Sequence, residues 1–184
     1  MVIVTGSIVL YRNERNVLLE AIGSFLQSGL VIKLYLIDNS PTDELKDIVI
    51  DARIEYIHNP SNPGFGAGHN IALKSAIQQG VTYHLILNPD VYYAESVLEE
   101  LTDYLEKNTD IGNIMPKVLY PNNEIQRLCK LLPTPYDWIG RRFNPFNKMV
   151  ERRNDLLNLD LQGMTVLWMY PIYRAVLCIC ESRH

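Results

Sequence analysis

Apolar positions along the chain alternate between short continuous runs and helical spacing, which is the pattern of an α/β fold with a mostly parallel sheet. The run Ser7–Tyr11 predicts a buried strand, and the apolar positions after it lie on one face of a helix that Gly29 ends. A second strand, Ile32–Ile37, precedes Ser40 and Pro41, which predict the cap and first residue of a second helix. The expected buried positions are Leu18, Ala21, Ile22, Phe25 and Leu26 in the first helix and Leu45, Ile48 and Val49 in the second.

The same order of elements continues along the chain. Ile54–Ile57 predicts a third strand, which a glycine-rich loop joins to a helix over Ile71–Gln79 that Gly80 ends. Tyr83–Leu87 predicts a fourth strand, and helical spacing returns around residues 97–105. The repeated strand-helix order predicts parallel neighbours in the sheet.

Polar residues follow the predicted strands at their carboxyl ends. In open parallel sheets these ends meet at one edge, and ligands bind there. We therefore expect Tyr11, Asp38, the glycine-rich loop and Asp90 to converge on one crevice. This convergence is the basis of the functional prediction.

Composition indicates an ordinary globular protein. The chain has 184 residues, 47% hydrophobic and 21% charged, which predicts one domain over residues 1–184 and excludes intrinsic disorder. Its formal charge of -4 lacks the basic excess of a nucleic-acid binder, so we expect no nucleic-acid partner.

Cysteine usage and hydropathy bear on location. An odd number of cysteines without a secretory signal indicates a reducing compartment, the cytoplasm. The most apolar stretch, 164–180, contains Pro171 and Arg174 and is shorter than the roughly 20 residues that span a bilayer, so we expect no transmembrane helix. The basic run between Arg141 and Arg153 is a candidate contact with anionic lipid at the inner face of the membrane, although such a run is more often a solvated face. The cysteines are Cys129, Cys178 and Cys180.

The segment Asn62–Asn70 carries three glycines in five residues directly before a predicted helix. Backbone amides left uncovered at a helix N-terminus attract phosphate, so this segment is a candidate diphosphate site. The alternative is a flexible or tightly turned connection.

Two carboxylates stand at predicted strand ends. Asp90, in Asn88-Pro89-Asp90, offers a hard oxygen ligand that suits Mg²⁺ or Mn²⁺ bridging a diphosphate. Asp38 can accept a hydrogen bond from a ribose hydroxyl or a base N–H. The alternative for each is a side chain that caps the next turn.

In this order the segments resemble family 2 glycosyltransferases of the GT-A fold, in particular the bacterial rhamnosyltransferase-like members that build surface polysaccharides. The resemblance covers roughly residues 5–160. It rests on Ser7–Tyr11 as the opening strand, Leu36–Ser40 as "VDNSS", residues 62–73 as "NxGFGxGNNxGI" and Leu87–Asp90 as the "LNPD" version of the DxD motif. It implies a Rossmann-like sheet flanked by helices, with an incomplete C-terminal acceptor part.

The resemblance also implies a role for each matched residue. Asp90 would hold the divalent metal, Mg²⁺ or Mn²⁺, on the donor diphosphate, and Asn88 would be the poorer metal ligand. The implied nucleotide-binding positions are Tyr11, Asp38, Asn39, Gly66, Asn70 and Asn88. The implied reaction is an inverting transfer of rhamnose or a hexose from dTDP-rhamnose or a UDP-sugar to a saccharide or lipid-linked acceptor.

The catalytic base that this family takes from a later acidic segment has no match here, and residues 162–184 form an atypical tail. Codons for Trp168–Leu177, read from each third base, permit Asp-Val-Pro-Tyr-Ile-Ser-Gly-Cys-Phe-Met, the strand that precedes that segment in the family. We therefore hypothesise that the reading frame slips upstream of Trp168, so that the chain ends before the base. Sequencing the gene tests this hypothesis.

Two alternatives stay open. The first is a catalytically inactive nucleotide-binding remnant or partner subunit, since the base is missing. The second is an NAD(P)-binding oxidoreductase, since a strand, a glycine-rich loop and a helix imitate a dinucleotide-binding unit. Against the second, His69 occupies the third glycine position of the G-x-G-x-x-G pattern, and the unit comes third in the chain rather than first.

Overall fold

The computed structural model describes residues 4–116, 118–119, 125–126, 164–167 and 176–179. The chain divides into two compact units, Met1–Pro116 with Val166–Glu181 and Lys117–Thr165 with Ser182–His184. Predictions on the basic run from Arg141 to Arg153 and on Cys129 fall outside the described residues. That the whole chain forms one domain stays a prediction.

The first unit is built on a parallel sheet in which the strand order is β3-β2-β1-β4-β9-β5, and every one of these neighbouring pairs is parallel. The predicted α/β fold with a mostly parallel sheet is therefore confirmed. The strands are β1 (Val4–Leu10), β2 (Val31–Asp38), β3 (Ile54–His58), β4 (Tyr83–Leu87), β5 (Asn113–Pro116) and β9 (Val176–Ile179). The other strands are β6 (Val118–Leu119), β7 (Ile125–Gln126), which pairs with β6 antiparallel, and β8 (Met164–Leu167).

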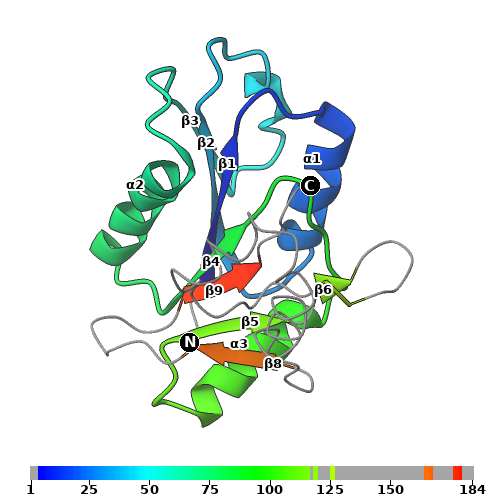
Figure 1. Ribbon diagram of the computed structural model, residues 1–184, viewed down its shortest axis with the longest axis vertical. Coiled ribbons are helices and arrows are strands. Elements are labelled where there is room, and N and C mark those ends of the chain that lie inside the picture. The colour runs from blue at the N-terminus through cyan, green and yellow to red at the C-terminus, as the bar shows by residue number, and fades with distance from the viewer. Residues whose placement is uncertain (1–3, 117, 120–124, 127–163, 168–175, 180–184) are drawn as a thin grey trace, which may run out of the picture. The chain divides into compact units, whose positions relative to one another are not determined.

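Helices lie on both faces of this sheet, with α1 (Arg15–Leu26) and α2 (Phe65–Gln78) on opposite sides of β1–β3 in Figure 1. Successive residues of β1 point to opposite faces of the sheet, so they face α1 and α2 in turn. A Cβ added at Gly6 would lie 2.5 Å from the Phe25 ring of α1, and one added at Gly68 of α2 would lie 2.7 Å from Val9 Cγ2. Both helices therefore pack closely on β1. A third helix, α3 (Val97–Lys107), follows β4.

The core consists of the strands and the inward faces of the helices. On the α2 face, Val9, Tyr35, Ile37 and Ala72 form a buried cluster. In α1 the predicted positions Leu18, Ala21, Ile22 and Phe25 are buried, and α3 buries Leu98, Leu101 and Leu105. Burial of each large apolar side chain contributes about 1.5–3 kcal/mol, so the apolar pattern determines which face of each element turns inward.

The helix predicted after Pro41 is wrong. Only a single 3-10 turn, η1 (Lys46–Ile48), forms there, and of the predicted buried positions Ile48 alone is buried. The Ser40 hydroxyl accepts a hydrogen bond from the Arg12 amide, so it does not cap a helix. Without enough apolar residues on one face, the segment gains too little burial to stabilise a helix.

The glycine-rich loop is also shorter than predicted, because α2 begins at Phe65 and includes Gly66, Gly68 and Asn70. Glycine is a poor helix former, but at Gly68 the missing side chain lets the helix lie against Val9. Tertiary packing therefore extends the helix through residues that local propensity assigns to a loop. The predicted C-terminal end of the helix is correct to within one residue, and Gly80 has a φ of 67° directly after the C-cap Gln79.

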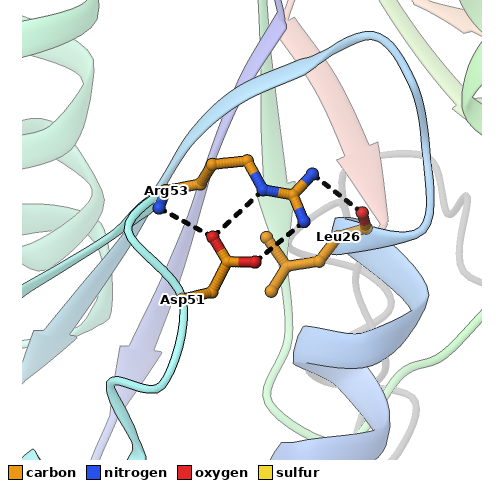
Figure 2. A network of polar contacts seen from close by, with 3 residues as sticks. All are labelled: Leu26, Asp51 and Arg53. Atoms are coloured by element: carbon orange, nitrogen blue, oxygen red, sulfur yellow. Dashed lines mark hydrogen bonds and ion pairs between the residues drawn. The ribbon is translucent and has the colours of Figure 1, made fainter.

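A polar network closes the amino end of β3, as Figure 2 shows. Asp51 Oδ1 accepts from the Arg53 amide at 2.8 Å and from Nε at 3.1 Å, while Oδ2 accepts from the guanidinium at 2.9 Å. The guanidinium also donates to the Leu26 carbonyl at 3.0 Å, at the end of α1. These hydrogen bonds, with those to the Arg53 side chain first, lower the pKa of Asp51 to about 2.

The tail supplies described strands to this architecture. Val176–Ile179 forms β9, which pairs with β4 through His84 and Leu85 and with β5 through Asn113 and Ile114. The slipped reading frame stays a prediction, because only the gene sequence tests it. Within the described ranges, none of the helices has the length and apolar character needed to cross a membrane.

Candidate functional site

The carboxyl ends of three neighbouring strands bring most of the predicted site residues to one edge of the sheet. In the parallel register Leu10 lies beside Asp38, and Ile8 lies beside Leu87. Tyr11, Asn39 and Asn88 therefore follow directly on adjacent strand ends. This is the edge at which open parallel sheets bind ligands.

Four polar contacts hold the turn after β2. Asp38 is fully buried, and its Oδ1 accepts from the Ser40 amide at 2.8 Å while its Oδ2 accepts from the Tyr56 hydroxyl at 2.5 Å. The Arg12 amide donates to Ser40 Oγ, and His58 Nε2 is 3.0 Å from the Ser40 carbonyl. Burial first, and then the hydrogen bond to Asp38, raises the pKa of Tyr56, so this hydroxyl stays a donor. The turn is consequently fixed before any ligand arrives.

Asn39 joins this turn to the start of α2. Its Nδ2 donates to the Gly64 carbonyl at 3.4 Å and lies 3.5 Å from the place where a Cβ on Gly68 would stand. The side chain is 2% exposed, and its Oδ1 has no hydrogen-bond partner within the described part of the chain. Asn39 therefore helps to position the first turn of α2.

The first turn of α2 has the geometry of an anion site. Gly64, the N-cap, has a φ of 97°, and it offers no side chain to cover the amides of Phe65, Gly66 and Ala67, which have no intrahelical acceptor. Gly66 and Asn70 are four residues apart, on one side of the helix, and both are exposed. The predicted phosphate site is consequently a helix start rather than a glycine-rich loop.

Tyr11 is the half-exposed aromatic residue of this edge, with 49% of its surface accessible. Its backbone amide donates to Asn13 Oδ1, and the Arg12 guanidinium lies 5.5 Å from the ring centroid. Arg12 has a φ of 53°, which is uncommon for a residue with a side chain. The result is an exposed ring with a cation beside it, a surface that suits a nucleobase and its phosphates.

Asn88 and Asp90 are half-buried in the turn after β4, where the Val91 amide donates to the Asn88 carbonyl at 3.3 Å. No group of three or more His, Cys, Asp or Glu side chains gathers within metal-binding reach among the described residues. A single carboxylate nevertheless suits Mg²⁺ or Mn²⁺ that is shared with substrate phosphates, because these ions take one or two protein carboxylates and fill the remaining positions with phosphate and water. The residues present are therefore compatible with such a metal.

The sequence patterns do not point to two groups of residues that support this edge from within the core. Tyr56 holds Asp38, and a buried chain of Thr5, Ser7, His69 and His84 lies beneath α2. The second group has a signal in the sequence, because Thr5 and Ser7 are two polar residues on one face of a strand whose other positions are buried and largely apolar.

A parallel sheet with flanking helices, and polar residues gathered where its strands end, form the arrangement that is typical of α/β proteins that bind nucleotides. The family model for glycosyl transferase family 2 matches residues 7–159. The chain therefore belongs to glycosyl transferase family 2, as the four sequence motifs predict.

Solved structures agree on the fold. The crystal structure of S. aureus TarS residues 1–349 is 14% identical with a TM-score of 0.56, over 74% of this chain and 44% of that one. A second crystal structure of S. aureus TarS gives 16% identity and a TM-score of 0.54, over 74% of this chain and 26% of that one. The chain thus spans less than half the length of either structure. No curated protein matches the chain significantly in sequence.

Proposed function

We propose that the chain is the donor-binding part of a glycosyltransferase, which transfers a sugar from a nucleoside-diphosphate donor to a saccharide or lipid-linked acceptor. The observation that carries this proposal is one edge of the sheet, where Tyr11 and Asp90 follow the adjacent strands β1 and β4 and the first turn of α2 follows β3. Family membership supports it, because the match extends over all of these residues. The proposed place of action is the cytoplasm, at the inner face of the membrane.

Each part of the edge has a separate task in this proposal. The Tyr11 ring stacks on the nucleobase, and the Arg12 guanidinium beside it adds positive charge near the phosphates. The uncovered amides of the first turn of α2 donate to the diphosphate, with Gly66 and Asn70 on the exposed side of the helix. Asn88 reaches the ribose or the sugar. Asp38 contributes through the turn that it fixes, and its direct contact with the nucleoside stays a prediction.

Asp90 is the residue that would hold Mg²⁺ or Mn²⁺. Such an ion, when bound, neutralises negative charge on the leaving nucleoside diphosphate. In the proposed inverting displacement an acceptor hydroxyl attacks the anomeric carbon, its proton passes to a base, and the diphosphate leaves. None of the described residues is assigned as that base. The alternative is therefore a nucleotide-binding chain without transfer activity.

A calorimetric titration with dTDP and UDP, each with and without Mn²⁺ and with NAD as control, tests the proposal. We expect binding of at least one diphosphate that depends on Mn²⁺, and no response to NAD. If the chain binds neither diphosphate, the donor site is refuted. A response to NAD alone would favour the oxidoreductase alternative. Preference between dTDP and UDP would indicate whether the donor is dTDP-rhamnose or a UDP-sugar.

A further inference from the structure

A chain of four buried polar side chains runs beneath the start of α2. Thr5 Oγ1 lies 2.8 Å from His84 Nδ1, His84 Nε2 lies 2.8 Å from Ser7 Oγ, and Ser7 Oγ lies 2.7 Å from His69 Nδ1. All four residues are at most 4% exposed. Buried polar groups are costly without partners, so a connected chain of this kind in a sheet core calls for an explanation.

The number of protons on these four side chains allows two arrangements of the hydrogen bonds. Burial lowers the pKa of His69 to about 4 and that of His84 to about 3, where the nearby His69 adds to the effect, so both imidazoles are neutral and carry one N–H each. The Ser7 hydroxyl then donates to one imidazole and accepts from the other. In both arrangements the chain ends at His69 Nε2, which is buried and has no partner among the described residues.

The position of His69 connects this chain to the proposed diphosphate site. His69 is the fifth residue of α2, so it lies one turn from the amides of Phe65, Gly66 and Ala67. The neighbouring residue Gly68 packs against Val9, and the His69 ring contacts the Phe65 ring edge-on with 4.4 Å between centroids. A bond from Ser7 to His69 therefore fixes both the rotation and the depth of the first turn of α2 on β1.

We propose that Ser7 and His69 are positioning residues for the donor diphosphate, and that His84 and Thr5 hold Ser7 in the orientation that this requires. The inference rests on the proposed function, since it assigns the Ser7–His69 bond to the same site. The strands that carry Ser7 and His84 also lead to Tyr11 and Asn88 at their carboxyl ends. The four hydrogen-bonded side chains thus connect the first turn of α2 to β1 and β4, the strands whose carboxyl ends complete the site.

Two amide substitutions at position 69 separate this role from simple core packing. In His69→Asn an amide atom replaces Nδ1, so the contact with Ser7 can persist. In His69→Gln the amide atoms stand near the place of Nε2, and the contact with Ser7 is lost. Ser7→Ala removes the same bond from the other side. Ser24→Ala is its matched control, because Ser24 is a buried serine of α1 whose hydroxyl donates to the Ala21 carbonyl of its own helix.

The measurement is the Kd of UDP and dTDP with Mn²⁺ by calorimetry, with the Tm of each variant beside it. We expect His69→Gln and Ser7→Ala to raise the Kd about tenfold, and His69→Asn and Ser24→Ala to keep it within about twofold of the wild type. A positioning role predicts that the Kd follows the presence of the Ser7 bond. A purely structural role predicts that the Tm falls in all of the buried variants while the Kd of the folded protein stays constant.

The outcomes distinguish this inference from the proposed function. A wild-type chain that binds neither diphosphate refutes both. If the wild type binds and His69→Gln and Ser7→Ala bind equally well, only the positioning role is refuted. It is refuted as well if both of these variants fail to fold, because the bond is then required for folding rather than for placing the site. Weak binding by Ser7→Ala and His69→Gln with near-normal binding by His69→Asn supports it.

Discussion

The two loops that flank β3 differ in how completely their polar groups are used. In the amino-side loop, residues 49–53, both oxygens of Asp51 accept from Arg53, and Arg53 also reaches the carbonyl of Leu26 (Figure 2). In the carboxyl-side loop, residues 59–64, the backbone takes positive φ values at Asn62 and Gly64 and leads to uncovered amides at the start of α2. The charged side chains of the first loop are paired, whereas the second loop leads to backbone donors without an intrahelical acceptor.

Under the proposed function, the amino end of β3 contributes to stability and the carboxyl end leads to the donor site. The side chains of the Arg53–Asp51 pair are 38% and 30% exposed, so screening by water keeps the contribution of this ion pair small. In the carboxyl-side loop Asn62 has a positive φ, and the amides of the first turn of α2 that follows have no intrahelical acceptor. Both features are typical of ligand sites. Substitutions on the two sides should therefore change different properties.

The largest expected effect is on metal-dependent binding. Replacing Asp90 with Ala removes the carboxylate that we propose as the metal ligand, so the affinity for UDP or dTDP in the presence of Mn²⁺ should fall by at least about 100-fold. Calorimetry with and without Mn²⁺ measures the change. Asp103→Asn, at an exposed position of α3, is the matched control and should bind as the wild type does. Equal binding by Asp90→Ala would remove Asp90 from the site.

Gly68→Ala should lower stability and weaken binding together. The added Cβ would stand 2.7 Å from Val9 Cγ2 and 3.0 Å from Cγ1, and a β-branched side chain in a strand has little freedom to move away. We expect a loss of about 1–3 kcal/mol in the free energy of unfolding, measured by urea denaturation, and a higher Kd for the diphosphate. Unchanged stability would mean that α2 does not pack this closely on β1.

Gly66→Ala separates the two properties. No atom lies within 4 Å of a Cβ added there, so the helix should gain about 0.5–1 kcal/mol from the lower entropy of the unfolded chain. If a diphosphate approaches the amides of this turn, the same methyl group obstructs it, and the Kd for UDP or dTDP should rise several-fold. A variant that is more stable and binds normally would place the diphosphate elsewhere.

Acid should destabilise the fold through the two buried histidines, His69 and His84. The unfolded chain binds protons with a histidine pKa near 6.5, whereas burial holds the pKa of His69 to about 4 and that of His84 to about 3. The stabilisation is complete above pH 6.5, and the free energy of unfolding falls as the pH drops towards 4, by up to about 1.4 kcal/mol per pH unit for each histidine. Denaturation at pH 7, 6 and 5 tests this, and His69→Asn should reduce the slope.

The smallest effect is expected on the amino side. Arg53→Ala breaks the network around Asp51 and frees the Leu26 carbonyl, so the Tm should fall slightly. Its Kd for UDP or dTDP should stay within about twofold of the wild type, because the network lies at the opposite end of β3 from the site. A large loss of binding here would show that the two ends of the strand are coupled.

Much of the fold and part of the site could be predicted from the sequence. The apolar runs placed β4 at Tyr83–Leu87 without error and identified four of the five predicted buried positions of α1, because burial of apolar side chains acts on each short segment separately. The fifth position, Leu26, is half-buried. The four motifs led to the family that the match over residues 7–159 confirms. The roles of the site residues stay predictions, and the variants at Asp90 and Gly66 test two of them directly. The others are Tyr11, Asp38, Asn39, Asn70 and Asn88.

The sequence by itself determined the first four strands, the helices that follow β1, β3 and β4, the family and the edge at which the site residues gather, since these follow from local patterns and from the rule that parallel strand ends meet. Only the tertiary structure decided that α2 begins at Phe65, that no helix follows Pro41, and that Ser7 bonds His69 and His84. Each of these depends on contacts between residues far apart in the chain. Close approach to Val9 lengthens one helix through its glycines, while competing hydrogen bonds and too little buried surface prevent the other.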